Sequence, residues 1–133
     1  MPASPSPFHL RLLRFISANL PPLLWAGVIF WFSAQSSLPS LQLSVPDFVL
    51  RKLAHIGVYL VLFLLVYRSI LLQNLAKPRS TRAFILVLII CLAYAITDEL
   101  HQLNVPGRYG SWRDVGYDSL GLGLAFLRRA GYI

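Results

Sequence analysis

The chain contains little charge, because Asp, Glu, Lys and Arg together make up only 13% of its 133 residues. Soluble domains usually carry about 25% charged residues, so this sequence has roughly half the charge that keeps a globular surface in water. The apolar residues, which are 56% of the chain, occur in long blocks rather than in alternating patterns. The shortage of charge therefore argues against a soluble globular protein and indicates a protein embedded in lipid.

Acidic residues are scarcer than basic ones: five Asp and Glu stand against twelve Lys and Arg, for a net charge of +7. A basic excess often indicates nucleic-acid binding. Here the basic residues flank blocks too apolar for a soluble surface, as they do in membrane proteins, so we expect no nucleic-acid partner. The single cysteine, Cys91, excludes an intramolecular disulfide, and its apolar surroundings predict a buried packing residue.

Four apolar segments approach the length that crosses a bilayer, which is about 20 residues. We predict spans at approximately 15–33, 53–72, 83–102 and 111–130. Pro21 and Pro22 interrupt the first span, so we expect its helix to bend or to begin there. The first span is longer than a signal-peptide core and lacks a convincing cleavage site, so we expect it to be retained. The fourth span is the weakest, because Asp114 and Asp118 lie within it. The sequence predicts one all-α domain over residues 1–133, an integral membrane four-helix bundle.

The distribution of basic residues predicts the orientation of the bundle. Eight lie on one side of the predicted spans: Arg11, Arg14, Arg68, Lys77, Arg79, Arg82, Arg128 and Arg129. Four basic residues lie on the other side: Arg51, Lys52, Arg108 and Arg113. All five acidic residues lie on that side as well. By the positive-inside rule, both termini are expected to be cytoplasmic. The segment 36–46, rich in Ser, Leu and Pro, is then expected to form an outer loop.

Polar side chains gather at the non-cytoplasmic ends of three predicted spans. They are Lys52, His55 and Tyr59 on one helical face, then Asp98, Glu99 and Gln102, then Ser111, Arg113, Asp114 and Asp118. Ionisable groups at membrane depth are costly and usually face the bundle interior or a wet cavity. We therefore expect these residues, with Arg108 of the preceding loop, to form one polar site. Gly121 and Ala125 continue the face of Asp118 with small side chains, which permits close helix approach.

A structural interpretation of the same residues stays open. Ser111 and Asp114 fit a capping box at the start of the fourth span. Arg51 and Lys52 are placed to extend toward the membrane interface. A buried polar network that only fixes helix register is therefore the alternative to a functional site.

Three motifs in order resemble those of a known family. They are Lys52-x-x-His55-x-x-x-Tyr59, Asp98-Glu99-x-x-Gln102 and Gly107-Arg108-x-Gly110-Ser111-x-x-Asp114, followed by Gly121. Together they resemble the VanZ-like family of small bacterial membrane proteins, over roughly Trp25 to Phe126. Ser33-Ala34-Gln35 is similar to the family's Ser-x-Gln ending of the first span, whereas Asp118 stands where the family often has Asn. The resemblance implies a multi-pass protein of the bacterial plasma membrane and an effect on susceptibility to teicoplanin, a lipid-tailed glycopeptide.

These observations lead to one functional hypothesis and one main alternative. A transporter is a third interpretation, for which four short spans leave little room unless the protein oligomerises. In the first, the site recognises, and in its catalytic form modifies, the head group of a membrane lipid, an envelope precursor or a lipoglycopeptide. Lys52, Arg108 and Arg113 would hold an anionic group. His55 and Glu99 would exchange a proton, with Asp114 as the third candidate catalytic residue. In the alternative, the protein binds an amphiphile or a membrane partner without catalysis, and the polar cluster is structural.

The remaining polar residues are assigned supporting roles in the first hypothesis. Asp98 and Asp118, together with Asp114, would orient the reacting groups or bind a divalent cation with His55, although no spacing specifies a metal. Tyr59, Gln102 and Ser111 are candidate binding residues. The sequence does not predict the oligomeric state.

Overall fold

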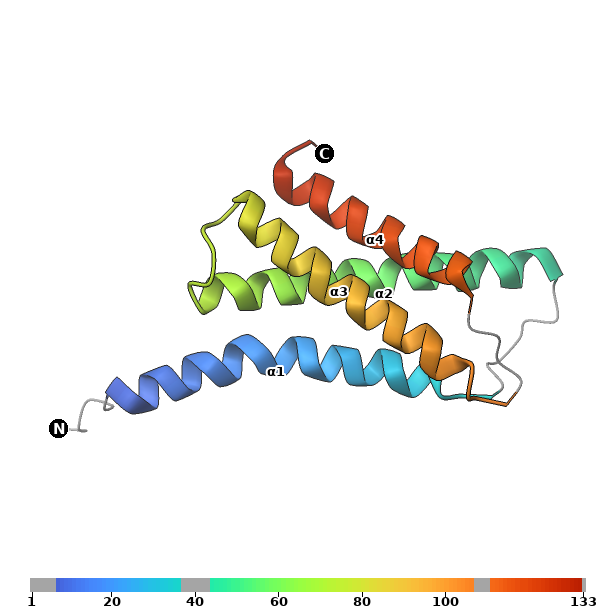
Figure 1. The fold of residues 1–133 in the computed structure, drawn as a ribbon, viewed down its shortest axis with the longest axis horizontal. Helices are drawn as coiled ribbons and strands as arrows, with labels where there is room; N and C mark the ends of the chain where they lie inside the picture. The colour runs from blue at the N-terminus through green and yellow to red at the C-terminus, as the bar shows by residue number, and fades with distance from the viewer. Residues whose placement is uncertain (1–6, 37–43, 107–110, 133) are drawn as a thin grey trace.

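The computed structural model describes residues 7–36, 44–106 and 111–132, which fold into four α-helices. They are α1 (Pro7–Ser33), α2 (Ser44–Leu72), α3 (Thr81–Gln102) and α4 (Trp112–Ala130). Successive helices run in opposite directions, so α1 and α3 end where α2 and α4 begin (Figure 1). The prediction of an all-α fold with four helices is confirmed.

Three of the helices are long and apolar enough to cross a membrane. The qualifying stretches are Phe8–Ser33, Val49–Leu72 and Thr81–Gln102. Their outer faces expose large apolar side chains, such as Leu23 of α1 and Ile89 of α3, which are 67% and 60% exposed. An apolar surface of this kind is suited to lipid rather than to water. The chain is therefore a multi-pass membrane protein, in which α4 is less apolar than the other three helices.

Helix α1 begins at Pro7 and continues through Pro21 and Pro22. The alternative that the helix begins at these two prolines is therefore wrong. Proline has no N–H, and Pro21 therefore leaves the carbonyl of Ser17 without its usual helical donor. The guanidinium of Arg68, on α2, donates a hydrogen bond of 2.8 Å to this carbonyl. A contact from the neighbouring helix thus replaces the backbone bond that the proline removes.

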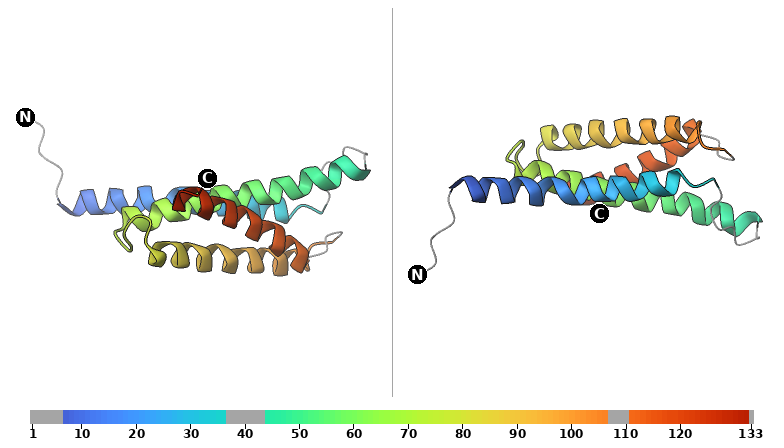
Figure 2. Two further views of the ribbon diagram at one scale, coloured as in Figure 1. Left: turned by 90° about the horizontal axis from the view of Figure 1, so that it is seen from above. Right: turned by 90° about the horizontal axis from the view of Figure 1, so that it is seen from below.

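Helix α2 begins at Ser44, nine residues before the predicted start of the second span at residue 53. The prediction of an outer loop over 36–46 is therefore wrong for its last three residues, while residues 37–43 lie outside the described part of the chain. Pro46 falls in the first turn of α2, where a missing N–H disturbs no intrahelical bond. The first turns of α2 extend beyond the other three helices (Figure 2).

Helix α2 occupies the centre of the bundle and contacts each of the other three helices. Its fully buried side chains include Tyr59 and Phe63, which pack in one cluster with Val87 and Cys91 of α3 and Leu122 of α4. Cys91 is the buried packing residue that the sequence predicts. The cluster positions the polar end of the bundle, because Tyr59 lies one turn from His55 on the same helix.

Gly121 brings α4 against the backbone of α2. A Cβ atom at this position would lie 2.2 Å from the carbonyl oxygen of Ile56 and 3.1 Å from the nitrogen of Leu60. Ala125, one turn further along α4, is fully buried as well. The predicted close approach along the face of Gly121 and Ala125 is confirmed.

Replacing Gly121 by Ala should destabilise the protein by about 1–3 kcal/mol, because the added methyl group meets backbone atoms that no side-chain rotation can move. Gly123→Ala is the matched control, since a Cβ at Gly123 has no atom within 4 Å. It should leave stability unchanged or raise it by up to about 1 kcal/mol, because alanine favours helix. Thermal unfolding of both variants in one detergent measures the difference, and equal melting temperatures would contradict the packing described here.

Candidate functional site

Most of the buried polar side chains in the described residues lie at the end of the bundle where α1 and α3 end. They are Ser33 of α1, Asp98, Glu99 and Gln102 of α3, and Asp118 of α4. None of these is more than 6% exposed. Four of the five are candidate site residues from the sequence, and the fold brings them together from separate helices. The fifth, Ser33, was not among the candidates.

Asp98 links α3 to α1. The hydroxyl of Ser33 donates a hydrogen bond of 2.7 Å to Oδ2 of Asp98. The side-chain amide of Gln102 donates to the same oxygen at 3.2 Å and to the hydroxyl of Ser33 at 3.3 Å. Sequence reasoning did not assign Ser33 to the site, although Ser33 stands in the Ser33-Ala34-Gln35 segment that contributed to the family resemblance.

Two polar pairs link α2 to α4. His55 Nδ1 and Asp118 Oδ1 are 2.8 Å apart and share a hydrogen bond. One turn nearer the end of the bundle, the ammonium group of Lys52 forms an ion pair with Asp114 and lies 5.0 Å from the centre of the Tyr117 ring. Lys52 and His55 of the predicted face therefore both contact α4, each through a separate aspartate.

Glu99 fixes the start of α4. Its carboxylate accepts a hydrogen bond of 2.8 Å from the backbone N–H of Ser111. The hydroxyl of Ser111 in turn accepts from the N–H of Arg113 at 3.2 Å, so the predicted capping role of Ser111 is confirmed. Asp114 does not complete a capping box with Ser111, because its side chain pairs with Lys52. Glu99, from another helix, satisfies the N–H that Asp114 would have capped.

A groove of about 340 Å³ runs between α1 and α2 and reaches the polar residues. Trp25, Val28 and Phe32 line it from α1. From α2 it is lined by Arg51, Lys52, Ala54, His55, Val58 and Tyr59, and at its polar end by Ser33, Asp98, Gln102 and Asp114. Val28 and Phe32 are 41% and 50% exposed, so the groove opens on the outer surface of the bundle. Arg51, interpreted from the sequence as an interfacial residue, is part of its lining.

Three other candidate residues have different environments. Arg113 is exposed on the first turn of α4 and does not line the groove. Arg108 lies outside the described residues. Tyr59 is 1% exposed, and its hydroxyl has no hydrogen-bond partner within the described part of the chain.

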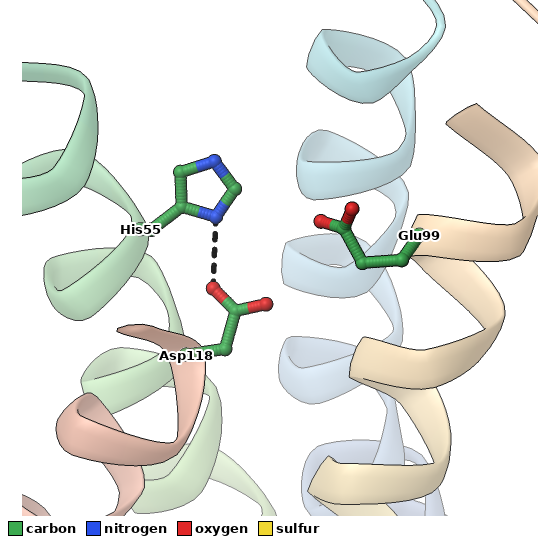
Figure 3. A group of neighbouring side chains, drawn as sticks. All are labelled: His55, Glu99 and Asp118. Carbon is green, nitrogen blue, oxygen red and sulfur yellow. Dashed lines mark hydrogen bonds and ion pairs between the residues drawn. The ribbon is translucent and has the colours of Figure 1, made fainter. Parts of the chain in front are cut away.

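His55, Glu99 and Asp118 form the closest group of potential metal ligands in the described residues. Each contributes one ligand atom, and the three atoms lie within 4.8 Å of one another. Figure 3 shows the side chains converging from α2, α3 and α4. An imidazole beside two carboxylates can exchange a proton with the one it contacts, here Asp118, or hold a cation with both.

In a comparison with known protein families, residues 5–128 match the family described as VanZ/LLP1. The match covers nearly the whole chain and includes every candidate site residue. It confirms the resemblance found from the three sequence motifs. Comparison with curated proteins and with solved structures gave no match.

Removing the hydroxyl of Ser33 should lower stability. Ser33→Ala leaves one oxygen of the buried Asp98 carboxylate without its shortest hydrogen bond, which costs about 1–3 kcal/mol. Ser17→Ala is the control on the same helix, because the exposed Ser17 hydroxyl donates only to the carbonyl of Arg14 in its own helix. That change should stay within about 0.5 kcal/mol. Chemical or thermal unfolding in detergent compares the two, and a loss no larger for Ser33→Ala would argue against the α1–α3 link.

Proposed function

The chain belongs to the VanZ/LLP1 family, and on that premise we propose that it recognises the head group of an anionic lipid or lipid-linked envelope precursor. The observation that carries this proposal is the groove between α1 and α2, which joins an apolar part to a polar end. An amphiphile has the same two parts. Its head group would lie among the buried polar residues and its acyl chain along the apolar lining.

The position of the lining residues supports entry from the bilayer. Trp25 and Val58 lie deeper in the bundle than Ser33 and Lys52, because α1 ends and α2 begins at the polar end. The indole N–H of Trp25 donates to the carbonyl of Val58 at 2.9 Å and joins the two helices at the apolar part of the groove. Since the rim exposes Val28 and Phe32 on the apolar surface of the bundle, a lipid can reach the groove sideways.

The polar end of the groove indicates the chemistry of the head group. Arg51 and Lys52 provide cationic side chains for a phosphate or carboxylate. The hydroxyl of Tyr59 and Oδ1 of Asp98 are buried and have no hydrogen-bond partner among the described residues. Buried polar atoms left unpaired cost about 1–3 kcal/mol each. A head group that combines an anionic group with hydroxyl or amine donors would satisfy both atoms.

Modification of the bound head group is a second step that the same end of the bundle could support. His55 lines the groove and shares its hydrogen bond with Asp118 behind it. An imidazole held by a carboxylate can accept a proton from a substrate hydroxyl. Recognition does not depend on this step.

We further propose that the polar end faces the outside of the bacterial plasma membrane, with both termini in the cytoplasm. In this orientation α4 forms the fourth crossing, and its final turn places Arg128 and Arg129 on the cytoplasmic side. The less apolar face of α4 is covered by α2 at Gly121. A lipoglycopeptide such as teicoplanin also has an acyl chain and a polar part, so it would reach the same groove from the outer leaflet.

The orientation can be measured with single cysteines in a Cys91→Ala background. Asn104→Cys lies beyond the end of α3 at the polar end, and Leu75→Cys lies in the turn between α2 and α3 at the opposite end. Both positions are exposed. A membrane-impermeant maleimide should label Asn104→Cys in intact cells and Leu75→Cys only after permeabilisation. The reverse pattern would contradict the proposed orientation.

Lipid binding can be tested with phosphatidylglycerol, which carries a phosphate and hydroxyl donors, against phosphatidylcholine, which has no such donors. Native mass spectrometry of the protein in detergent should show tighter binding of phosphatidylglycerol by at least about tenfold, equal to about 1.4 kcal/mol. Val28→Trp, which fills the groove from its exposed rim, should abolish this preference.

Ile89→Trp is the matched control for this experiment, because Ile89 is exposed on α3 and does not line the groove. This variant should bind phosphatidylglycerol as the unchanged protein does. Equal affinity for the two lipids, or equal effects of the two tryptophans, would contradict recognition at the groove.

A further inference from the structure

His55, Glu99 and Asp118 belong to three helices, yet one ligand atom from each lies within 4.8 Å of the other two. We propose that these residues bind a single divalent transition-metal cation. Zinc and similar ions hold nitrogen and oxygen ligands at about 2.0–2.2 Å, so two ligands of one ion lie up to about 4 Å apart. A small inward movement of the three side chains is therefore enough to close the site.

Asp118 provides an independent indication of a ligand. The residue is 0% exposed, and its Oδ1 shares a hydrogen bond with the imidazole of His55. Its other oxygen, Oδ2, is buried without a hydrogen bond from any described residue. In Figure 3 this oxygen lies on the side of Asp118 that faces Glu99. A carboxyl oxygen excluded from water requires a hydrogen-bond donor or a cation, and a metal ion between Asp118 and Glu99 would supply the missing interaction.

Glu99 is held in a way that suits a metal ligand. Its Oε2 accepts a hydrogen bond from the N–H of Ser111 at 2.8 Å, whereas among the described residues its Oε1 has only a long contact of 3.5 Å from the amide of Gln102. A carboxylate ligand is commonly oriented by a hydrogen bond from outside the metal's ligand set. In Figure 3 the Glu99 carboxylate points toward Asp118 and His55.

The charges and donor types indicate the class of ion. Two carboxylates with a neutral imidazole carry two negative charges, which one divalent cation balances. One nitrogen and two oxygen ligands suit Zn²⁺, Fe²⁺ or Mn²⁺ better than Ca²⁺ or Mg²⁺, which prefer oxygen alone. Three protein ligands leave a coordination position for water or for an anionic group. Because His55 also lines the groove, the ion would lie beside a bound head group.

Metal binding can be tested without any lipid, so its outcome is separate from that of the proposed function. Tag-free protein in detergent, stripped with a chelator, is equilibrated with Zn²⁺ or Co²⁺ and separated from free metal. Elemental analysis should find about one ion per chain, bound with a rise in melting temperature. Co²⁺ should give a visible absorption band that reports its ligand geometry.

Glu99→Gln and Asp98→Asn form a matched pair of variants. The two carboxylates are adjacent on α3 and are 5% and 4% exposed, but only Glu99 belongs to the proposed ligands. Glu99→Gln should weaken Zn²⁺ binding by at least about tenfold and remove the metal-dependent rise in melting temperature. Asp98→Asn should keep both properties.

Two results would overturn the proposal. The first is a failure of the protein without substitutions to take up Zn²⁺ or Co²⁺. This result would exclude the metal site even if a variant fails to fold. The second is equal binding by Glu99→Gln and Asp98→Asn, which would mean that the ion binds elsewhere. His101→Ala tests whether His101 binds the ion instead. His101 lies near the same end of the bundle, where its ring stacks on that of Phe30 with the ring centres 4.3 Å apart. This variant should keep its affinity for the metal.

Discussion

The structure depends on satisfying buried carboxylates inside the bundle. Burying a charged or polar group is costly unless the group is paired or hydrogen-bonded, so each acid needs a partner from a neighbouring helix. Asp98 accepts a hydrogen bond from Ser33 on α1, and Asp114 forms an ion pair with Lys52 on α2. Asp118 shares a hydrogen bond with His55 on α2. Each of these contacts joins two helices at the polar end of the bundle. Together with the hydrogen bond from the N–H of Ser111, the residue before α4, to Glu99, they fix the register of all four helices at this end.

The close packing of α4 on α2 is a condition for these pairs. Asp118 lies one helical turn before Gly121, on the same face of α4. Only because Gly121 has no side chain can α4 approach the backbone of α2 at Ile56, the residue that follows His55. The short side chain of Asp118 then reaches the imidazole at 2.8 Å. The close packing at Gly121 and the hydrogen bond between His55 and Asp118 are thus parts of one arrangement.

The sequence was sufficient to predict the four helices, because hydrophobic length is a local property. It was also sufficient to predict that the polar residues meet at one end, since antiparallel helices bring alternate ends together. It could not show that α1 passes through Pro21, because the donor that replaces the lost hydrogen bond is Arg68 on another helix. Nor could it show which acid meets which base. The pairing of Lys52 with Asp114 and the link between Ser33 and Asp98 depend on helix rotation, which no local pattern specifies.

The four acids at this end of the bundle differ in the kind of partner they have. Asp114 and Asp118 contact basic side chains, whereas Asp98 and Glu99 are contacted only by neutral donors within the described part of the chain. Buried charges can often be replaced by apolar residues without loss of stability, so retaining incompletely paired acids is expected mainly where they serve a function.

The two less completely paired acids also face different neighbours. Consecutive helical residues are separated by about 100° around the axis. Asp98 accordingly contacts Ser33 and lines the groove between α1 and α2, while Glu99 contacts Ser111 and lies with His55 and Asp118. In the two proposals the adjacent carboxylates on α3 would therefore have separate roles, Asp98 beside a lipid head group and Glu99 beside a metal ion. His55 borders both places.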